Sequence, residues 1–313
     1  MEETRPRAFV CITGQLSRLE LENKEEKLFR HRHETFGVDF DVALVLSGTN
    51  HSSIRRGGKA EQKFFDTKEV ADYLNTIPGV TILNEDIFVG SENPVINPQY
   101  HKQRSADNGQ TESQRLQRCQ NNIRQFESLA QCFYHMQHSP LAAGKYDTVH
   151  RVRDDSGYYL EVPYEKLLNM TRKRPKTIVS SSCQQHGGIN DRGSFVSPLA
   201  TYDYFVPPII HMYTQPLPTD VRSTEFFLMN AYTKTSYVVE MHQFHMFRIG
   251  SPDDTDEFYP GTKIQRFLPG TNFESERGTL RRCTEGLHED SPRRGGPRCH
   301  LFSTGRRVCD EIA

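Results

Sequence analysis

Two arginines and two aspartates follow an apolar run near the middle of the chain. The segment 146–157 begins with aromatic and β-branched residues and ends in Arg151-Val152-Arg153-Asp154-Asp155-Ser156-Gly157. This pattern is typical of a buried strand that runs out into a polar site. Because Mg²⁺ takes one or two protein carboxylates and completes its shell with phosphate oxygens and water, the segment suits a divalent cation with an attached diphosphate. The alternative is a surface turn whose Arg–Asp pairs neutralise each other.

A second polar cluster follows an apolar run at the N-terminus. The run 8–13 predicts a strand, and the next turn contains Thr13, Gly14, Gln15 and Arg18. A glycine lets backbone N–H groups approach a ligand closely, so we expect these four residues to contact a nucleotide. The turn lacks the G-x-G-x-x-G pattern, which argues against a nicotinamide or flavin site. A plain turn between a strand and a helix is the alternative.

Two further clusters could bind a second substrate. The loop 184–192 includes Gly187, Gly188, Asn190, Asp191 and Arg192. Its glycines would let the backbone approach a hydroxyl-rich ligand, and its amide and charged side chains would hydrogen-bond it. An Asx turn with a helix cap is the alternative. The last cluster is the acidic helix start Ser223-Thr224-Glu225, for which an ordinary N-cap is the alternative.

The elements that must position these clusters alternate between strand and helix patterns. Strands are expected at 8–13, 40–46, 80–83, 146–153, 178–180 and 195–196, with strand-like sequence at 237–249. Helices are expected at 16–30, 67–74, about 112–137, 163–168, 199–205 and 223–232, and a polar excursion at 93–110. The Pro207-Pro208 pair is expected to end a helix. Strand, helix, strand without a hairpin signal predicts right-handed parallel units, hence an α/β fold with a mostly parallel sheet.

The chain of 313 residues is interpreted as one Rossmann-like domain, 1–273, with a poorly ordered Arg-, Gly- and Pro-rich tail, 274–313. Its 39 basic and 40 acidic side chains nearly cancel, so no global field favours nucleic acid. No apolar segment approaches the roughly 18 residues needed to span a bilayer. The N-terminus lacks the apolar core of a signal peptide. We therefore expect a soluble, cytoplasmic protein.

The cysteines and the glycosylation triplets are interpreted as those of a cytoplasmic protein. Seven cysteines without tight spacing predict mostly free thiols rather than a disulfide framework. The triplets Asn50-His51-Ser52 and Asn169-Met170-Thr171 match the N-glycosylation pattern. Because the N-terminus shows no export signal, we interpret both as chance matches.

The order of the motifs resembles a group of GT-A type nucleotide-sugar glycosyltransferases, over about residues 8–250. The resemblance comprises R-x-R-x-D at 151–155, N-D-R at 190–192, the later acidic helix start, and the turn Cys11-Ile12-Thr13-Gly14-Gln15-Leu16, which is similar to a V-x-x-x-G-Q-x-R opening. In that family a D-x-D-like motif binds the metal diphosphate, and the match falls on Arg151, Arg153 and Asp155. Two departures are Asp154-Asp155, which is not a strict D-x-D, and Gly193, where an aromatic is more usual.

The resemblance implies transfer of a sugar from a nucleoside diphosphate sugar to a glycan or other hydroxyl acceptor. Asp154 and Asp155 would hold Mn²⁺ or Mg²⁺ and, with the arginines, stabilise the charge on the leaving diphosphate. If configuration inverts, a carboxylate must take the acceptor's proton. We expect Asp191 rather than Glu225, because a helix dipole lowers the basicity of Glu225. The alternative is a non-catalytic binding or structural protein that retains a GT-A-like fold.

Overall fold

The protein is described here from a computed structural model. The structure describes residues 5–16, 19, 21–48, 66–104, 111–141, 145–158, 162, 164–173, 176–181, 191–214, 224–233, 238–242, 246–248, 299–301 and 307–309.

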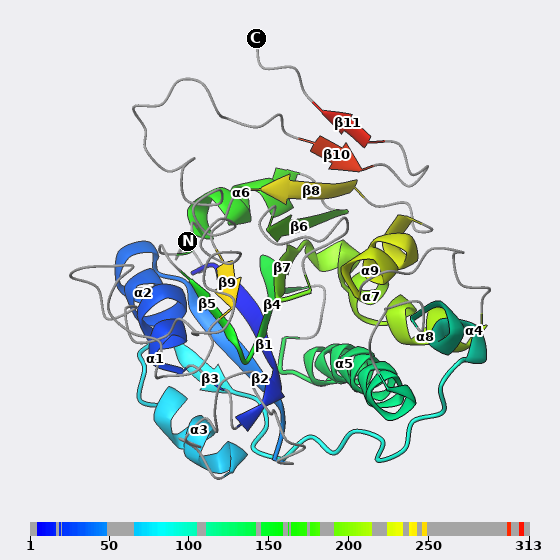
Figure 1. Ribbon diagram of the computed structural model, residues 1–313. Helices are drawn as coiled ribbons and strands as arrows, with labels where there is room; N and C mark the ends of the chain where they lie inside the picture. Colours follow the sequence, from blue (N-terminus) through cyan, green and yellow to red (C-terminus); the bar gives the residue numbers. More distant parts are fainter. Residues whose placement is uncertain are drawn as a thin grey trace, which may run out of the picture.

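Within the described residues, a nine-stranded sheet forms the centre of the fold, in the order β11-β10-β8-β6-β7-β4-β1-β2-β3 (Figure 1). Its strands are β1 (Arg7–Gln15), β2 (Asp39–Ser47), β3 (Val80–Ile82), β4 (Thr148–Arg153), β6 (Thr177–Ser181), β7 (Gly193–Val196), β8 (Val238–His242), β10 (Cys299–Leu301) and β11 (Arg307–Cys309). Two short strands, β5 (Ser156–Tyr158) and β9 (Met246–Arg248), pair separately.

The direction of the strands confirms the predicted α/β fold with a mostly parallel sheet. Strands β1, β2, β3 and β4 are mutually parallel, and so are β6 and β8. Strand β7 is antiparallel to β4 and β6, and β10 is antiparallel to β8 and β11. Followed from neighbour to neighbour, β7 and β10 therefore run against the other seven strands. The domain boundary predicted at residue 273 is not tested, and β10 and β11 lie beyond it.

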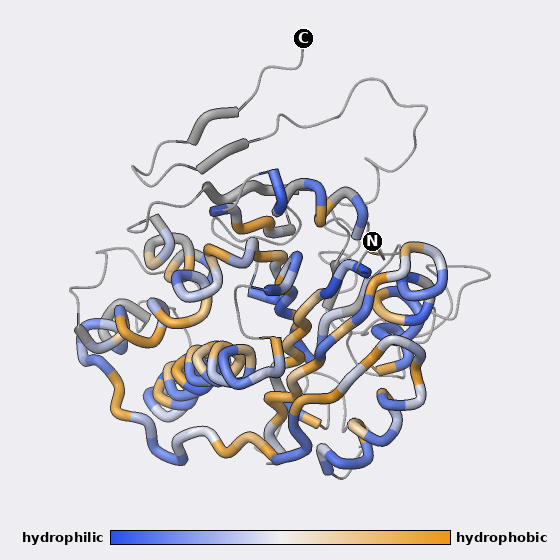
Figure 2. Tube along the Cα trace, turned by 180° about the vertical axis from the view of Figure 1, so that it is seen from behind, coloured by the Kyte–Doolittle hydropathy of each residue, from blue (hydrophilic) through white to orange (hydrophobic). Residues whose placement is uncertain are grey.

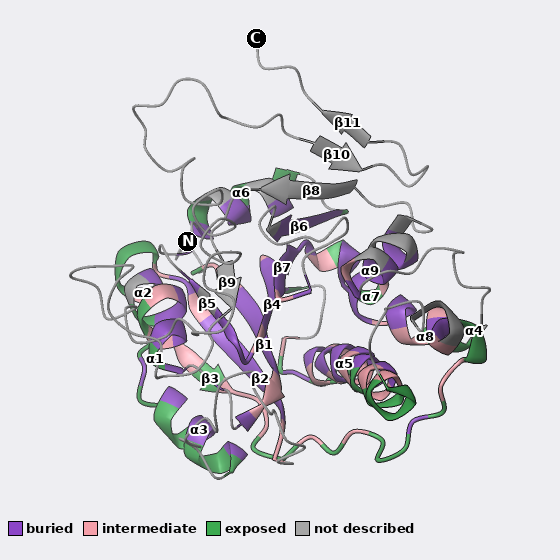
Figure 3. Ribbon diagram, in the orientation of Figure 1, coloured by how far each residue is buried: buried purple, intermediate pink, exposed green. Residues whose placement is uncertain are grey.

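Helices cover both faces of the sheet (Figure 1). One face carries α1 (Leu21–Lys24), α2 (His31–Phe36), α3 (Thr67–Leu74) and α6 (Tyr164–Lys173). The other carries α4 (Pro98–Arg104), α5 (Glu112–Gln137), α7 (Thr201–Phe205), α8 (Pro207–Thr214) and α9 (Thr224–Thr233). Alternate residues of β1 enter the two cores: Val10 and Ile12 pack on the first face, Phe9 and Cys11 on the second. Figures 2 and 3 show the central strands as hydrophobic and buried.

Local sequence explains where the main helices begin. Helix α5 starts with a capping box, in which Thr111 accepts a hydrogen bond from the backbone of Gln114 and the Gln114 side chain caps Thr111 in return. Helix α3 begins after Asp66, whose carboxylate accepts the N–H of Glu69 at 2.8 Å. The 26 residues of α5 then lie across β1 and β2, as expected for the central helix.

Three predictions about helices need correction. Helix α7 ends at Phe205, before Pro207, as expected, but Pro207 also begins α8, a helix that was not expected, because proline suits the first helical turn, where its missing N–H costs nothing. Helix α4 lies within the stretch expected to be a polar excursion. The helix expected over 16–30 begins at Leu21 and continues, through a π-helical turn at Glu25–Arg30, to Phe36. Gly37, with φ 63°, ends it in the left-handed conformation.

One disulfide lies among the cysteines that were expected to be mostly free thiols. Of the three cysteines whose side chains the structure describes, Cys11 and Cys132 form a disulfide and Cys119 is buried. The two partners are 121 residues apart and meet because α5 packs on β1. The spacing of the cysteines in the sequence therefore could not indicate this pair.

None of the helices within the described residues combines the length and the apolar character that a membrane span requires.

Candidate functional site

The predicted clusters meet at the carboxyl ends of β1 and β4, in the middle of the sheet. From β1 the chain moves to β2 and β3 on one side, and it returns to β4 on the other side of β1. Thr13 pairs with Arg153 in the register of these two strands, and the N–H of Asp154 donates to the carbonyl of Thr13 at 2.7 Å. Such a reversal of strand order opens a crevice at the strand ends, which is where open α/β sheets bind ligands.

Gly14 and Asp154 lie against each other at this position. Gly14 has φ +135°, and a Cβ placed on it would lie 2.2 Å from Cγ of Asp154. Oδ2 of the same carboxylate accepts the N–H of Gln15 at 2.9 Å. The strand-end turn therefore needs a glycine, because an L side chain here would overlap Asp154 and strain the backbone.

Arg151 is buried beneath the turn. Its Nε donates to the hydroxyl of Thr13 at 3.2 Å, and its Nη1 donates to the carbonyl of Asp191. The side chain is 1% exposed. Burial, and secondarily the charge of Arg153, lower the pKa of this guanidinium from its usual value. Arg151 thus joins the ends of β1 and β4 to the turn before β7.

Arg153 joins two carboxylates. Its Nη2 lies 2.9 Å from Oδ2 of Asp155, and its Nη1 lies 2.7 Å from Oδ2 of Asp191. Although burial opposes the charge, Asp155, Asp191 and Asp154 outweigh it and raise the pKa of Arg153. The guanidinium therefore stays charged at any accessible pH.

Asp191 is held from two sides. Besides Arg153, the side-chain amide of Gln125 on α5 donates to Oδ2 of Asp191, at 3.1 Å. Burial alone would raise the pKa of Asp191, but Arg153 and then Arg192 and Arg151 lower it below its usual value. A carboxylate in this state is ionised at neutral pH and is a weak proton acceptor.

Lys24 belongs to the site although the sequence did not indicate it. It is fully buried, and its Nζ donates to the carbonyls of Asp154 and Ser156 at 2.8 and 2.9 Å. The hydroxyl of Ser156 in turn donates to the carbonyl of Arg192 at 3.2 Å, and that carbonyl also accepts the N–H of Arg153. Lys24 lies about 130 residues before its partners in a charged helical segment, where no local pattern marks it.

Helix α5 contacts both the start of α9 and this cluster. The hydroxyl of Thr224 donates to the side-chain oxygen of Asn122, 3.2 Å away. Asn122 and Gln125 are three residues apart on α5, so they occupy neighbouring positions on one helix face. Because Gln125 holds Asp191, α5 contacts both Asp191 and the first residue of α9, and the half-buried Glu225 follows that residue.

Eight of the sequence-predicted residues thus meet at one place: Thr13, Gly14, Gln15, Arg151, Arg153, Asp154, Asp155 and Asp191. The backbone of Arg192 joins them, while Arg18, Gly187, Gly188 and Asn190 lie outside the described residues.

Lys24, Arg151 and Arg153 balance Asp154, Asp155 and Asp191 in formal charge. Arg153, whose side chain is 18% exposed, is the most exposed of these six. No group of three or more His, Cys, Asp or Glu within the described ranges could hold a metal by itself.

His150 supports β4 from the opposite face. Its Nε2 lies 2.7 Å from the hydroxyl of Tyr158 and its Nδ1 lies 3.3 Å from that of Tyr164. The ring stacks on Phe195 with centroids 3.8 Å apart. Burial, followed by the charges of Arg151 and Lys24, lowers the pKa of His150 well below its usual value. His150 is therefore a neutral part of the core rather than a proton donor to the site.

Among the solved structures to which the chain is similar, two share little sequence with it. No protein-family model and no curated protein matches the sequence. The mannosyltransferase Ktr4p from S. cerevisiae aligns over 91% of this chain and 82% of its own, at 12% identity and a TM-score of 0.39. A putative nucleotide-diphospho-sugar transferase from Desulfovibrio desulfuricans G20 aligns over 63% of this chain and 65% of its own, at 10% identity and a TM-score of 0.28. At these TM-scores neither likeness bears on function.

Proposed function

We propose that this protein is a glycosyltransferase of GT-A type that moves a sugar from a nucleoside diphosphate sugar to a hydroxyl acceptor. The observation that carries the proposal is the position of Arg153. This guanidinium lies at the strand-order reversal, between the carboxylates of Asp155 and Asp191. Ligand binding at such a reversal is the rule for open α/β sheets.

Arg153 is suited to take the diphosphate. Guanidinium groups bind phosphate and carboxylate oxygens with the same fork of N–H donors. A diphosphate could therefore replace Asp155 or Asp191 on Arg153, the most exposed side chain of the cluster. When the bond from the anomeric carbon to the diphosphate breaks, the leaving group keeps the electron pair, and a fixed cation stabilises that charge.

The described charges fit a cation that arrives with the diphosphate. Among the described residues, Lys24, Arg151 and Arg153 balance the three aspartates and Arg192 adds one positive charge near Asp191, which is less than the charge of a bare diphosphate. Asp154 and Asp155 supply two hard oxygen ligands, the number that Mg²⁺ takes when phosphates supply others. We propose that these two residues hold Mn²⁺ or Mg²⁺, with Asp155 released from Arg153. Bound there, the cation would supply Lewis-acid stabilisation of the diphosphate.

If the reaction inverts the configuration at the anomeric carbon, a carboxylate must take the proton of the acceptor hydroxyl. The sequence favoured Asp191 over Glu225 for this role. The ion pair with Arg153 and the lowered pKa make Asp191 a weak base. We therefore propose that Asp191 positions Arg153, and that Glu225, at the nearby start of α9, takes the proton as the new bond to the anomeric carbon forms.

The test is transfer by the purified chain from a panel of nucleoside diphosphate sugars, in manganese and in chelator. We expect release of nucleoside diphosphate that falls about a hundredfold or more in Arg153→Ala, in line with loss of one charge-stabilising donor. Arg172→Ala is the matched control, because Arg172 pairs with Asp147 at the opposite end of β4, 2.6 Å away. Nucleotide binding without any turnover would support the non-catalytic alternative instead.

A further inference from the structure

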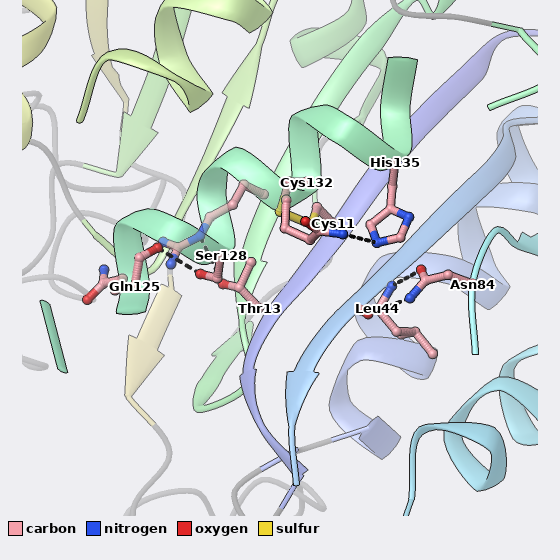
Figure 4. The surroundings of a disulfide bond; sticks show 10 residues. Cys11, Thr13, Leu44, Asn84, Gln125, Ser128, Cys132 and His135 are labelled. Atoms are coloured by element: carbon pink, nitrogen blue, oxygen red, sulfur yellow. Dashed lines mark hydrogen bonds between the residues drawn. A yellow bond between two sulfur atoms is a disulfide. The ribbon is translucent and has the colours of Figure 1, made fainter. Parts of the chain in front are cut away.

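The disulfide indicates the compartment in which the chain folds. Cys11 of β1 and Cys132 of α5 are both fully buried, with Cα atoms 5.8 Å apart, within the usual range for a disulfide. Figure 4 shows the bond between the strand that carries Thr13 and the helix that carries Gln125 and Ser128. Disulfides persist in oxidising compartments and are rare where glutathione keeps thiols reduced. The Cys11–Cys132 bond therefore indicates folding in an oxidising compartment.

One glycosylation triplet is presented on the surface of the same fold. Helix α6 buries Tyr164, Leu167, Leu168 and Thr171, at the spacing of one helix face. Asn169 lies on the opposite face and is exposed, together with Glu165, Arg172 and Lys173. A glycan on the Asn169 amide would therefore extend into solvent without displacing the core.

The hydroxyl of the triplet sets the time at which modification can occur. Thr171 is 1% exposed, and its Oγ1 lies 3.1 Å from the carbonyls of Leu167 and Leu168 and 3.2 Å from that of Asp147. An enzyme that reads the triplet needs this hydroxyl, which is inaccessible once α6 packs on the sheet. Modification must therefore precede folding, during synthesis into the compartment that also forms the disulfide.

We propose that Asn169 is an N-glycosylation site, used in the oxidising compartment where Cys11 and Cys132 pair. The co-reactant is a lipid-diphosphate-linked oligosaccharide. The amide nitrogen of Asn169 forms a bond to the anomeric carbon of the first sugar, the bond from that carbon to the diphosphate oxygen breaks, and the lipid diphosphate leaves with the electron pair. The amide loses one proton to a base of the transferring enzyme. The interpretation of this triplet as a chance match rested on the expectation of a cytoplasmic protein, and the disulfide is an independent indication of the compartment.

The test expresses the full chain behind a cleavable secretion leader in eukaryotic cells, in an Asn50→Gln background so that one triplet remains. Peptide mapping of the secreted protein without reduction should find a Cys11–Cys132 cross-link and a glycan on Asn169 in most molecules. Treatment with peptide-N-glycosidase should shift the slower gel band to the mobility of the Asn169→Gln variant. That variant lacks the acceptor amide of Asn169. Thr171→Ser is the matched control, because it keeps both the triplet and the buried hydroxyl, and it should remain glycosylated.

Two outcomes would overturn the proposal. One is a secreted, folded chain with the Cys11–Cys132 cross-link and an unmodified Asn169. The other is a folded chain with both cysteines reduced, since the compartment argument would then fail. Neither outcome depends on sugar transfer by this protein, so the proposed function is judged separately.

Discussion

The carboxylate of Asp154 occupies the space that a side chain at Gly14 would need. A Cβ at position 14 would lie 2.2 Å from both Cγ and Oδ1 of Asp154, while Oδ2 accepts the N–H of Gln15 at 2.9 Å. The turn after β1 and the turn after β4 are therefore built as one unit. A substitution in either turn should therefore alter the conformation of the other.

We expect Gly14→Ala to lower the free energy of unfolding by about 2–5 kcal/mol, from backbone strain at φ +135° together with overlap with Asp154. Chemical denaturation measures this loss. Gly37→Ala is the matched control: it has φ +63° with nothing within 4 Å, so it should cost only about 1–2 kcal/mol for the left-handed conformation. Equal losses in the two variants would contradict the contact between Gly14 and Asp154.

Asp155→Asn should weaken nucleoside diphosphate binding in manganese and change it little in chelator. The substitution keeps the shape of the side chain but removes one charge and weakens the ion pair with Arg153. Titration calorimetry under both conditions gives the two affinities. Asp72→Asn, in an exposed ion pair with Lys68 on α3, should change neither. An Asp155 variant with full manganese-dependent affinity would show that the metal lies elsewhere or is not used.

Asp191→Asn and Glu225→Gln separate positioning from proton transfer. If Asp191 positions Arg153, its variant should weaken donor binding and lower turnover together, while retaining the pH profile of the wild type. If Glu225 is the base, its variant should lower kcat by about a hundredfold and remove the acid limb of the pH profile. Steady-state kinetics across pH measures both. The reverse pattern would restore Asp191 as the base.

How far the sequence predicted this site depended on distance along the chain. The strand exit at Arg151–Asp155 and the turn at Gly14 carry local patterns, and both lie where expected. The contacts of Lys24 with the Asp154–Ser156 turn and of Gln125 with Asp191 span about 130 and 66 residues. Such contacts arise when helices pack on the sheet, and the hydrophobic periodicity of the sequence does not predict them. The same applies to Cys11 and Cys132. Helix α8 was missed because Pro207 was interpreted only as the end of the preceding helix, whereas proline also begins helices.

The buried His150 should make stability fall as pH drops from about 6.5 to 5. Its pKa in the folded chain is lowered, so the unfolded chain binds more protons in this window and unfolding becomes easier. The slope contributed by one such histidine approaches about 1.4 kcal/mol per pH unit. Urea denaturation at several pH values should show a flatter profile for His150→Gln. His135, half-buried with a lowered pKa, acts with the same sign, so His135→Gln is the control and should flatten the profile less.

The most direct test of the account is thermal stabilisation by a panel of nucleoside diphosphates with manganese. A ligand that binds the native state alone raises the unfolding midpoint. We expect at least one nucleoside diphosphate to raise the midpoint of the wild type and of Arg172→Ala, and to have little effect on Arg153→Ala. A panel without effect on the wild type, or equal stabilisation of Arg153→Ala, would contradict a diphosphate site at the ends of β1 and β4.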